Sequence, residues 1–149
     1  MARLRRTGPF HVERPFSGGL AAGVLATAAL GQFERLERAF LGKEPPYAPP
    51  RVAERLFGSR RLGRLLRWTY GPSLGIVYAL LRSRLGPFAV AYGASVALAE
   101  LVLMPRACAL PRLRGRERIA LFAHAIAFAL AAEVALRQAR RASPSAIAV

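Results

Sequence analysis

The sequence predicts an all-α integral membrane protein, a four-helix bundle with a short basic interfacial helix in its first loop. Three observations predict it: apolar residues fall into four blocks, basic residues lie between or at the ends of these blocks, and small residues recur at a four-residue spacing within them. A soluble domain of 149 residues with 54% apolar residues would instead distribute them along amphipathic elements. Segregation of this kind is typical of a chain that crosses a bilayer several times.

The four apolar blocks define the predicted spans, at about residues 16–33, 65–81, 88–104 and 119–136. A helix rises about 1.5 Å per residue, so about 17 residues cover about 26 Å, slightly less than a hydrocarbon core of about 30 Å. Local thinning of the bilayer and interfacial anchors accommodate spans of this length. The second block is the least apolar, and it contains Gly71 and Pro72.

Basic segments flank and connect the predicted spans. Residues 1–15 form a basic, proline-interrupted N-terminal tail and residues 138–149 a flexible C-terminal tail, so the transmembrane domain covers residues 16–137. The first span is expected to continue as a helix to about Leu41, before an extended proline-rich stretch. Arg51–Arg67 then has the apolar and basic pattern of a short helix that lies in the membrane interface.

The first apolar block has two interpretations, a retained membrane anchor or a cleaved signal peptide. Arg3, Arg5 and Arg6 precede the block, and Ala26-Thr27-Ala28 resembles a cleavage site. We expect a retained anchor because three more spans follow. With four spans both termini share one side, and the larger loops on the other side carry more basic residues. The positive-inside rule then favours termini outside and larger loops in the cytoplasm.

The formal charge of +15 is compatible with two classes of partner, nucleic acids and anionic membranes. The basic residues of this arginine-rich chain lie outside the apolar blocks or at their ends, where they attract anionic lipid headgroups. No nucleic-acid-binding motif accompanies the charge. We therefore expect the lipid bilayer and anionic lipid headgroups as partners, with a second copy of the chain or another membrane protein, and no nucleic acid.

Small residues form stripes within the predicted spans. Stripes of this kind let helix backbones approach closely in lipid, although an alanine-rich span also produces such spacings by chance. We expect the stripes to pack a compact bundle, with one stripe left over for oligomerisation. The residues are Gly19, Gly23, Thr27 and Gly31 in the first span, Gly71 and Gly75 in the second, Gly93 in the third, and Ala123, Ala127, Ala131 and Ala135 in the fourth.

Ionisable residues within the predicted spans form a first polar cluster. Insertion of a charged side chain at the centre of a bilayer costs about 2.5–3.5 kcal/mol or more, which makes each such residue a candidate for function. Antiparallel connectivity brings Glu100 and His124 to a similar depth on the side of the larger loops, together with Tyr70. A hydrogen bond or ion pair between Glu100 and His124 is expected there.

A second polar cluster is predicted near the opposite face of the membrane. Glu133 lies there, at the level of Tyr78 near the end of the second span and of Tyr92 near the start of the third. Arg82 or Arg137 can extend its side chain toward this cluster.

Three roles are open to the polar clusters: structural bonding between helices, a proton or ligand pathway, and catalysis. Interhelical hydrogen bonds of this kind average about 0.6 kcal/mol, which is consistent with a structural role. Catalytic motifs are absent from the sequence, and Cys108, as a single cysteine, can form neither an intrachain disulfide nor a cysteine-based metal site. We expect no enzymatic activity, no cofactor and no metal.

The spans also resemble a known family. Trp68-Thr69-Tyr70-Gly71 with Gly75 and Tyr78, Tyr92-Gly93 with Pro105, and His124 in the last span are similar to the YagU-like family of small bacterial inner-membrane proteins, as are Glu34 and the proline-rich loop after it. The resemblance covers most of residues 16–136 and implies four spans but no reaction, because the family has no established biochemical activity. The last span departs from the pattern, with Ala125-Ile126 in place of an aromatic-glycine pair.

These observations predict a multi-pass protein of the bacterial cytoplasmic (inner) membrane without catalytic activity. Its role is expected to be structural, or to depend on association with itself or with other membrane components. The alternative is a small oligomeric transporter or channel-like protein, with an ion or proton path near Glu100 and His124.

Overall fold

The computed structural model describes residues 10–42, 44 and 47–142 of the chain. Within these ranges the chain is helical and contains no β-strand, which confirms the predicted all-α class. The elements are α1 (Phe10–Leu41), α2 (Pro49–Phe57), the short 3-10 helix η1 (Arg60–Leu62), α3 (Gly63–Leu85), α4 (Ala89–Ala107) and α5 (Arg116–Ala142).

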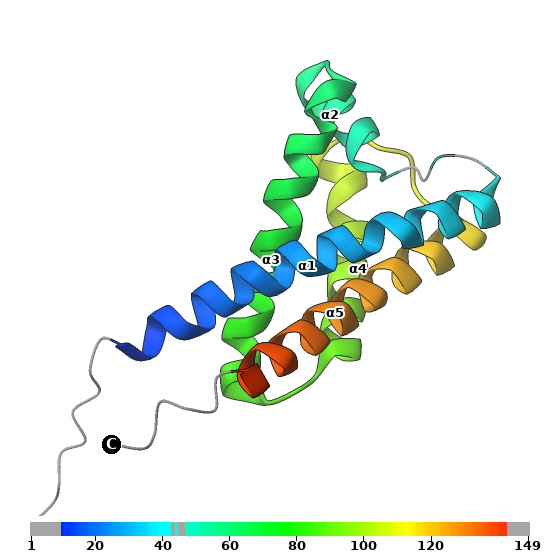
Figure 1. Cartoon of the computed structure of the whole chain (residues 1–149). Coiled ribbons are helices and arrows are strands. Elements are labelled where there is room, and N and C mark those ends of the chain that lie inside the picture. The colour runs from blue at the N-terminus through cyan, green and yellow to red at the C-terminus, as the bar shows by residue number, and fades with distance from the viewer. Residues whose placement is uncertain (1–9, 43, 45–46, 143–149) are drawn as a thin grey trace, which may run out of the picture.

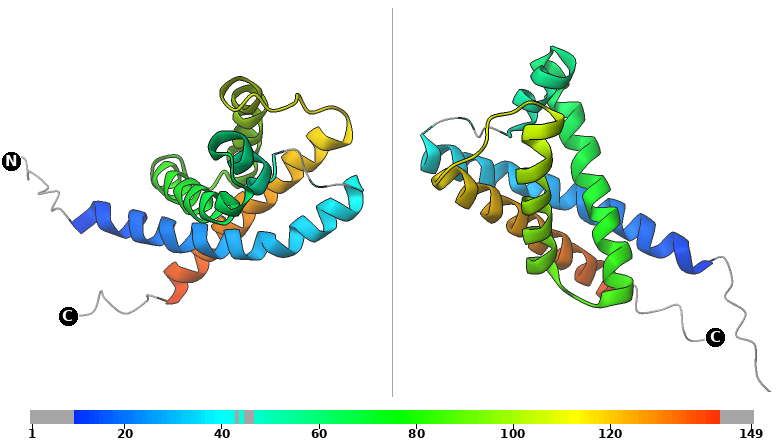
Figure 2. Two further views of the ribbon diagram at one scale, coloured as in Figure 1. Left: turned by 90° about the horizontal axis from the view of Figure 1, so that it is seen from above. Right: turned by 180° about the vertical axis from the view of Figure 1, so that it is seen from behind.

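The four long helices form two crossed antiparallel pairs. Helices α1 and α5 lie side by side in one layer, and α3 and α4 lie in the layer behind them (Figures 1 and 2). The most extensive contacts join α1 to α3 and to α5, and α4 to α5. Helices α1 and α4 end where α3 and α5 begin, and we call this the loop end. The opposite end holds the α3–α4 turn and the C-terminal part of α5, and we call it the hairpin end.

Three of the described helices are long and apolar enough to cross a membrane by length and composition: Pro15–Leu41 within α1, Ala89–Ala107 and Arg116–Arg141. Helix α3, which contains the predicted second span, is not among them. Arginines lie near both of its ends, and hydroxyl groups and a Gly-Pro pair lie between them. These residues lower its mean hydropathy, although its length is sufficient.

Helices α1 and α5 both extend past the predicted ends of the transmembrane domain. Helix α1 begins at Phe10, inside the predicted N-terminal tail, and continues through Pro15. Proline supplies no amide hydrogen, so one backbone hydrogen bond is lost there while the helix persists. Helix α5 continues to Ala142, into the predicted C-terminal tail. The rest of the two predicted tails, residues 1–9 and 143–149, lies outside the described residues.

The predicted interfacial helix over Arg51–Arg67 is divided in the structure. Gly58 ends α2 in a left-handed conformation with φ of +68°, a common way for a helix to stop. The η1 turn follows, and the last part of the predicted helix belongs to α3. Helix α2 buries Val52 and Ala53 and packs on η1 and α3. Large apolar side chains at its C-terminal end remain exposed: Leu56 and Phe57.

Glycines bring the backbones of α1 and α3 into direct contact. A Cβ atom added to Gly23 would lie 2.7 Å from Pro72 Cα, and one added to Gly75 would lie 2.5 Å from the Gly19 carbonyl oxygen. Thr27 fills the space beside Gly71, and its hydroxyl donates a hydrogen bond to the Gly23 carbonyl. The predicted stripes of the first two spans therefore meet each other.

Two other predictions about small residues need correction. Gly31 touches no other helix backbone, because its nearest neighbour is the Arg67 guanidinium at 3.5 Å. On α5, Ala123 is exposed, whereas Ala127, Ala131 and Ala135 are partly buried and pack against the core. A second set, offset around the helix, is more deeply buried: Ala125, Ala129 and Ala132. Gly93 of α4 meets this helix, since a Cβ there would lie 2.6 Å from Ile126 Cα.

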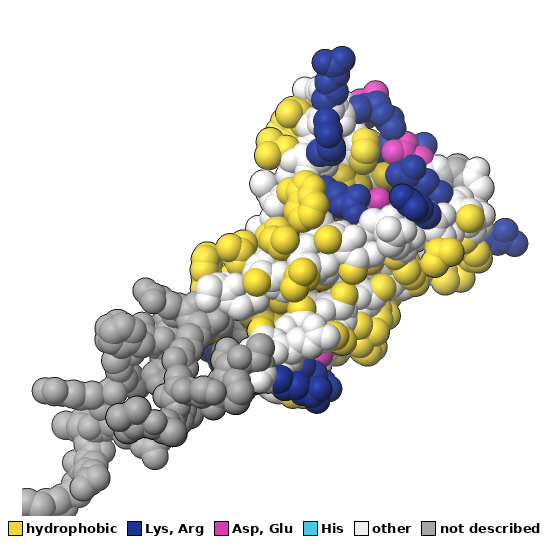
Figure 3. Space-filling view, viewed as in Figure 1, with side chains coloured by type: hydrophobic (Ala, Val, Ile, Leu, Met, Phe, Trp, Pro, Cys, Tyr) yellow, Lys and Arg dark blue, Asp and Glu magenta, His cyan; other side chains and the backbone are white. Residues whose placement is uncertain are grey.

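The outer surface carries large apolar side chains between two basic ends. Figure 3 shows hydrophobic side chains along α1 and α5, with arginine side chains gathered around α2 at one end and near the end of α5 at the other. Such a surface is suited to lipid contact with basic residues at the headgroups. Exposed members of the apolar surface include Leu20, Val24 and Leu25 on α1, Val77 and Leu80 on α3, Val90, Leu98 and Val102 on α4, and Leu130 and Val134 on α5.

Candidate functional site

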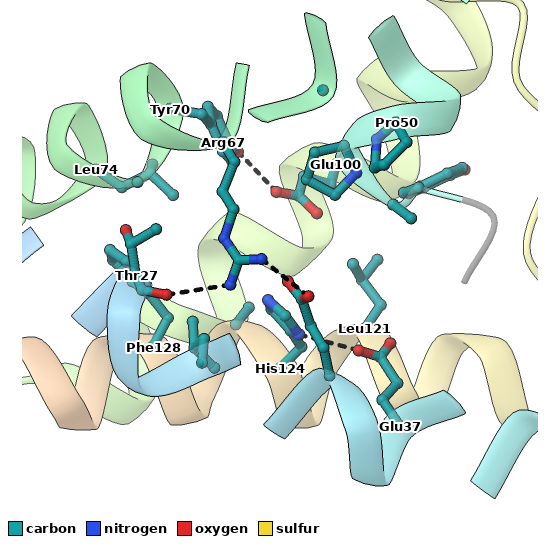
Figure 4. A pocket seen from close by; sticks show the side chains of 18 of the residues that line it. Thr27, Glu37, Pro50, Arg67, Tyr70, Leu74, Glu100, Leu121, His124 and Phe128 are labelled. Carbon is teal, nitrogen blue, oxygen red and sulfur yellow. Dashed lines mark hydrogen bonds and ion pairs between the residues drawn. The ribbon is translucent and has the colours of Figure 1, made fainter. Parts of the chain in front are cut away.

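A cavity of about 230 Å³ lies at the loop end of the structure. Four helices enclose it, and the segment before and at the start of α2 covers it. Figure 4 shows charged side chains from several helices converging on this space. Much of the remaining lining is apolar: Leu30, Leu74, Val96, Leu121, Ala125 and Phe128.

Arg67 enters the cavity from the first part of α3. Its Nη1 donates a hydrogen bond to Glu34 Oε2 at 3.0 Å, and its Nη2 donates to the Thr27 carbonyl oxygen at 3.2 Å. The guanidinium thus joins α3 to α1 at two points (Figure 4). This ion pair neutralises the charge of Glu34, and it leaves the Arg67 guanidinium already bonded to α1.

His124 pairs with Glu37 and not with Glu100, so the predicted Glu100–His124 bond is wrong. Its Nδ1 lies 3.0 Å from Glu37 Oε2, and its ring meets the edge of Phe33. Glu37 is buried. The partner differs because α1 continues beyond the predicted span and carries this glutamate alongside α5.

Glu100 lies in the same cavity with a different partner. The Tyr70 hydroxyl donates a hydrogen bond of 2.7 Å to Glu100 Oε1. Within the described ranges no basic side chain forms an ion pair with this carboxylate. The predicted grouping of Tyr70, Glu100 and His124 around one site therefore agrees with the structure, while the pairing within the group does not.

The cover of the cavity is tied down by loop contacts. The Tyr47 hydroxyl donates to the Pro111 carbonyl oxygen at 3.3 Å, and a Cβ on Gly63 would lie 2.6 Å from Pro50 Cα. Glu44 accepts hydrogen bonds from Arg60 at 2.7 Å and from Arg51 at 3.1 Å. Partial burial opposes ionisation of Glu44, but the two arginines outweigh it and hold the pKa of this carboxyl below its usual value.

The second polar cluster lies at the hairpin end, as predicted, and both candidate arginines contribute to it. Glu133 is buried and accepts hydrogen bonds from the Tyr78 hydroxyl at 2.7 Å, from Arg82 Nη2 at 2.9 Å and from Arg137 Nε at 2.6 Å. Tyr92 does not reach Glu133. Its ring packs on Tyr78 with centroids 5.0 Å apart, and its hydroxyl donates to the Leu74 carbonyl oxygen instead.

Sequence reasoning missed the charged residues of the cavity other than Glu100: Glu34, Glu37, Arg38, Arg64 and Arg67. The predicted continuation of the first helix to Leu41 was the available signal, because residues three apart on that continuation share a face. Arg67 was assigned to the interfacial helix. Among the described residues no group of three or more His, Cys, Asp or Glu side chains could hold a metal ion.

No protein-family model matches the chain, and searches of curated proteins and of solved structures give no match either. The resemblance to the YagU-like family stays a prediction. The assignment of function consequently depends on the geometry of the two polar clusters.

Proposed function

We propose that this chain is a four-span protein of the bacterial cytoplasmic membrane that binds a small molecule in the cavity at its loop end. The observation that carries the proposal is the cavity of about 230 Å³ with charged side chains on several of its walls. Protein interiors are normally packed to a density close to that of organic crystals, with few voids larger than a water molecule. An unfilled space beside converging polar groups is the usual form of a binding site.

The connectivity supports α3 as the fourth span. Helix α1 ends at the loop end and α4 begins at the hairpin end, so the chain between them has to cross the bundle, and α3 is the helix that does so. Its 23 residues extend about 34 Å at about 1.5 Å per residue. Its polar groups have partners inside the bundle or on the helix: Arg82 contacts Glu133, and the Ser73 hydroxyl donates to the Thr69 carbonyl.

A purely structural role explains the polar contacts at the hairpin end. It does not explain the cavity beside Glu100 at the loop end. Arg82 and Arg137 both neutralise Glu133, and the aromatic rings of Tyr78 and Tyr92 pack beside it. At the loop end Glu100 has one neutral donor and an adjacent cavity. We therefore attribute ligand binding to the loop end and a structural role to the hairpin end.

Transport is a second candidate, favoured by the position of the two clusters at opposite ends. Between them lies a packed core in which Ala26, Tyr78 and Ala129 are fully buried, so the cavity does not continue through the bundle. Transport would require the contacts of Glu133 to open while the loop end closes. A permanently open channel is not supported.

We first expected this chain to act by association with other chains, and the packing of the glycine stripes weakens that expectation. The glycine stripes that would have served oligomerisation are used between the helices of one chain. A partner would have to bind the exposed aliphatic side chains instead. We also propose that the chain belongs to the YagU-like family and has no enzymatic activity.

Side-specific thiol labelling tests the proposal. In a Cys108→Ser background, Ala125→Cys places a thiol on the cavity wall, and Ala129→Cys places one a turn deeper in the packed core. We expect membrane-impermeant methanethiosulfonates to modify the first variant and not the second. Modification should occur only from the side that also labels native Cys108, which caps α4 at the loop end.

Two results would overturn the proposal. One is Ala125→Cys that stays unmodified from both sides while Cys108 is labelled normally. The other is equal modification of both variants, because it would mean that the core itself is open to water.

A further inference from the structure

We propose that the ligand is a small amphiphilic monocation whose charged group binds Glu100, an inference that rests on the proposed binding function. The charges of the cavity wall support it. Glu34 is paired with Arg67, and Glu37 is paired with His124. Glu100 is the carboxylate on this wall that forms no ion pair among the described residues.

The second oxygen of Glu100 is open. Oε1 accepts the Tyr70 hydroxyl at 2.7 Å, and no hydrogen bond to Oε2 is formed by the described residues. No fully buried side-chain oxygen in the described structure lacks a partner, so Oε2 has accessible surface. Figure 4 shows this carboxylate joined to Tyr70 and separate from the Arg67 and His124 pairs. A carboxylate within a membrane protein is costly without a counter-charge, and a cationic ligand supplies one.

The rest of the wall suits the apolar part of such a ligand. Leu74, Val96 and Leu121 are aliphatic, and Tyr70 and Phe128 present aromatic rings, whose faces attract cations. A volume of about 230 Å³ is below the range of about 300–1,000 Å³ for drug-sized pockets. The ligand is therefore small, with one charged group and a compact apolar body.

An anionic ligand fits this wall less well. Arg67 is already bound to Glu34 and to the Thr27 carbonyl. Arg38 and Arg64 line the cavity but are exposed at its rim, where arginine suits lipid headgroups. An anion inside would face Glu100 directly. A cation inside is attracted by Glu100 and is not opposed by Arg67, whose charge is already paired.

Equilibrium dialysis with three probes of similar shape tests the inference. The probes are benzyltrimethylammonium, its neutral carbon analogue neopentylbenzene, and the anion phenylmethanesulfonate, measured against protein-free micelles of a neutral detergent. We expect the full chain to bind the cation at least tenfold more tightly than either other probe. Glu100→Gln should remove that preference, and the exposed Glu54→Gln should keep it as the matched control.

A second measurement does not depend on the Glu100 variant. Benzyltrimethylammonium should slow the modification of Ala125→Cys by neutral methyl methanethiosulfonate at least tenfold, and neopentylbenzene at the same free concentration should not. The inference is overturned if the cation does not bind, if the neutral or anionic probe binds as tightly, or if Glu100→Gln leaves the preference unchanged. Equal binding of cation and neutral analogue, with Ala125→Cys still reactive, would retain the proposed cavity and remove only the cationic ligand.

Discussion

At the hairpin end Glu133 accepts hydrogen bonds from Tyr78, Arg82 and Arg137, whereas at the loop end Glu100 accepts one, from Tyr70. The same residue types, a glutamate and a tyrosine on neighbouring helices, occur in both places. At the hairpin end the surrounding space is filled, and at the loop end a cavity remains. A carboxylate among packed helices is therefore not in itself a sign of function. Its counter-charge and the space beside it separate a structural group from a binding group.

The largest effect on stability is expected at the hairpin end. Glu133→Gln removes the charge that neutralises Arg82, whose side chain is 9% exposed. Breaking a buried ion pair by removing one partner costs about 3–5 kcal/mol, so we expect a loss of about 3 kcal/mol in the free energy of unfolding. Denaturation in mild detergent, followed by circular dichroism, measures it. A loss below about 1 kcal/mol would show that the cluster is not structural.

The next largest loss of stability is expected where the backbones of α1 and α3 pack against each other. Gly75→Ala would force a Cβ to within 2.5 Å of the α1 backbone, and overpacking of this kind costs about 1–3 kcal/mol. Gly31→Ala is the matched control, because its nearest neighbour is a flexible guanidinium at 3.5 Å. The same unfolding measurement applies to both. Equal losses in the two variants would argue that close helix approach is unimportant for this bundle.

The smallest effect is a pH-dependent loss of stability in the segment that covers the cavity. Although partial burial opposes its ionisation, Arg60 and Arg51 hold the pKa of Glu44 below its usual value of 4.5, so its contribution to stability is fully present above pH 4.5. The contribution is lost as the pH falls through the lower pKa of the folded state. We expect protease cleavage between residues 42 and 58 to rise on acidification below that value, with little change in the helices.

Glu44→Gln is the control for the pH effect. At neutral pH this variant should already show the raised cleavage, because it lacks the charge that binds Arg51 and Arg60. Its cleavage should then change little with acidification. A variant that behaves like the native chain at every pH would contradict the assignment.

Hydropathy and spacing were sufficient to predict the helical class, the level of both polar clusters and the close approach of helices at small residues. They describe depth along the membrane well, because each residue adds a fixed rise to a helix. Depth alone grouped Tyr70, Glu100 and His124 at one end and Tyr78 and Glu133 at the other.

Position around a helix axis was harder to predict. His124 binds Glu37 because of how α1 and α5 cross, and nothing in the local sequence of α5 specifies that crossing. Ala123 of α5 was misassigned for the same reason, since Ala occupies many positions of this helix and any row of them resembles a packing stripe. The cavity itself is the space left between four helices and a loop, and so no single segment encodes it.

Thermal unfolding of three proteins with and without benzyltrimethylammonium tests most directly whether the two ends have different roles. A ligand that binds only the folded state raises the melting temperature. We predict that Glu100→Gln keeps the native melting temperature and loses the rise with ligand, while Glu133→Gln melts lower and keeps the rise. The account would be contradicted if Glu100→Gln were destabilised as much as Glu133→Gln, or if the rise with ligand survived in Glu100→Gln and disappeared in Glu133→Gln.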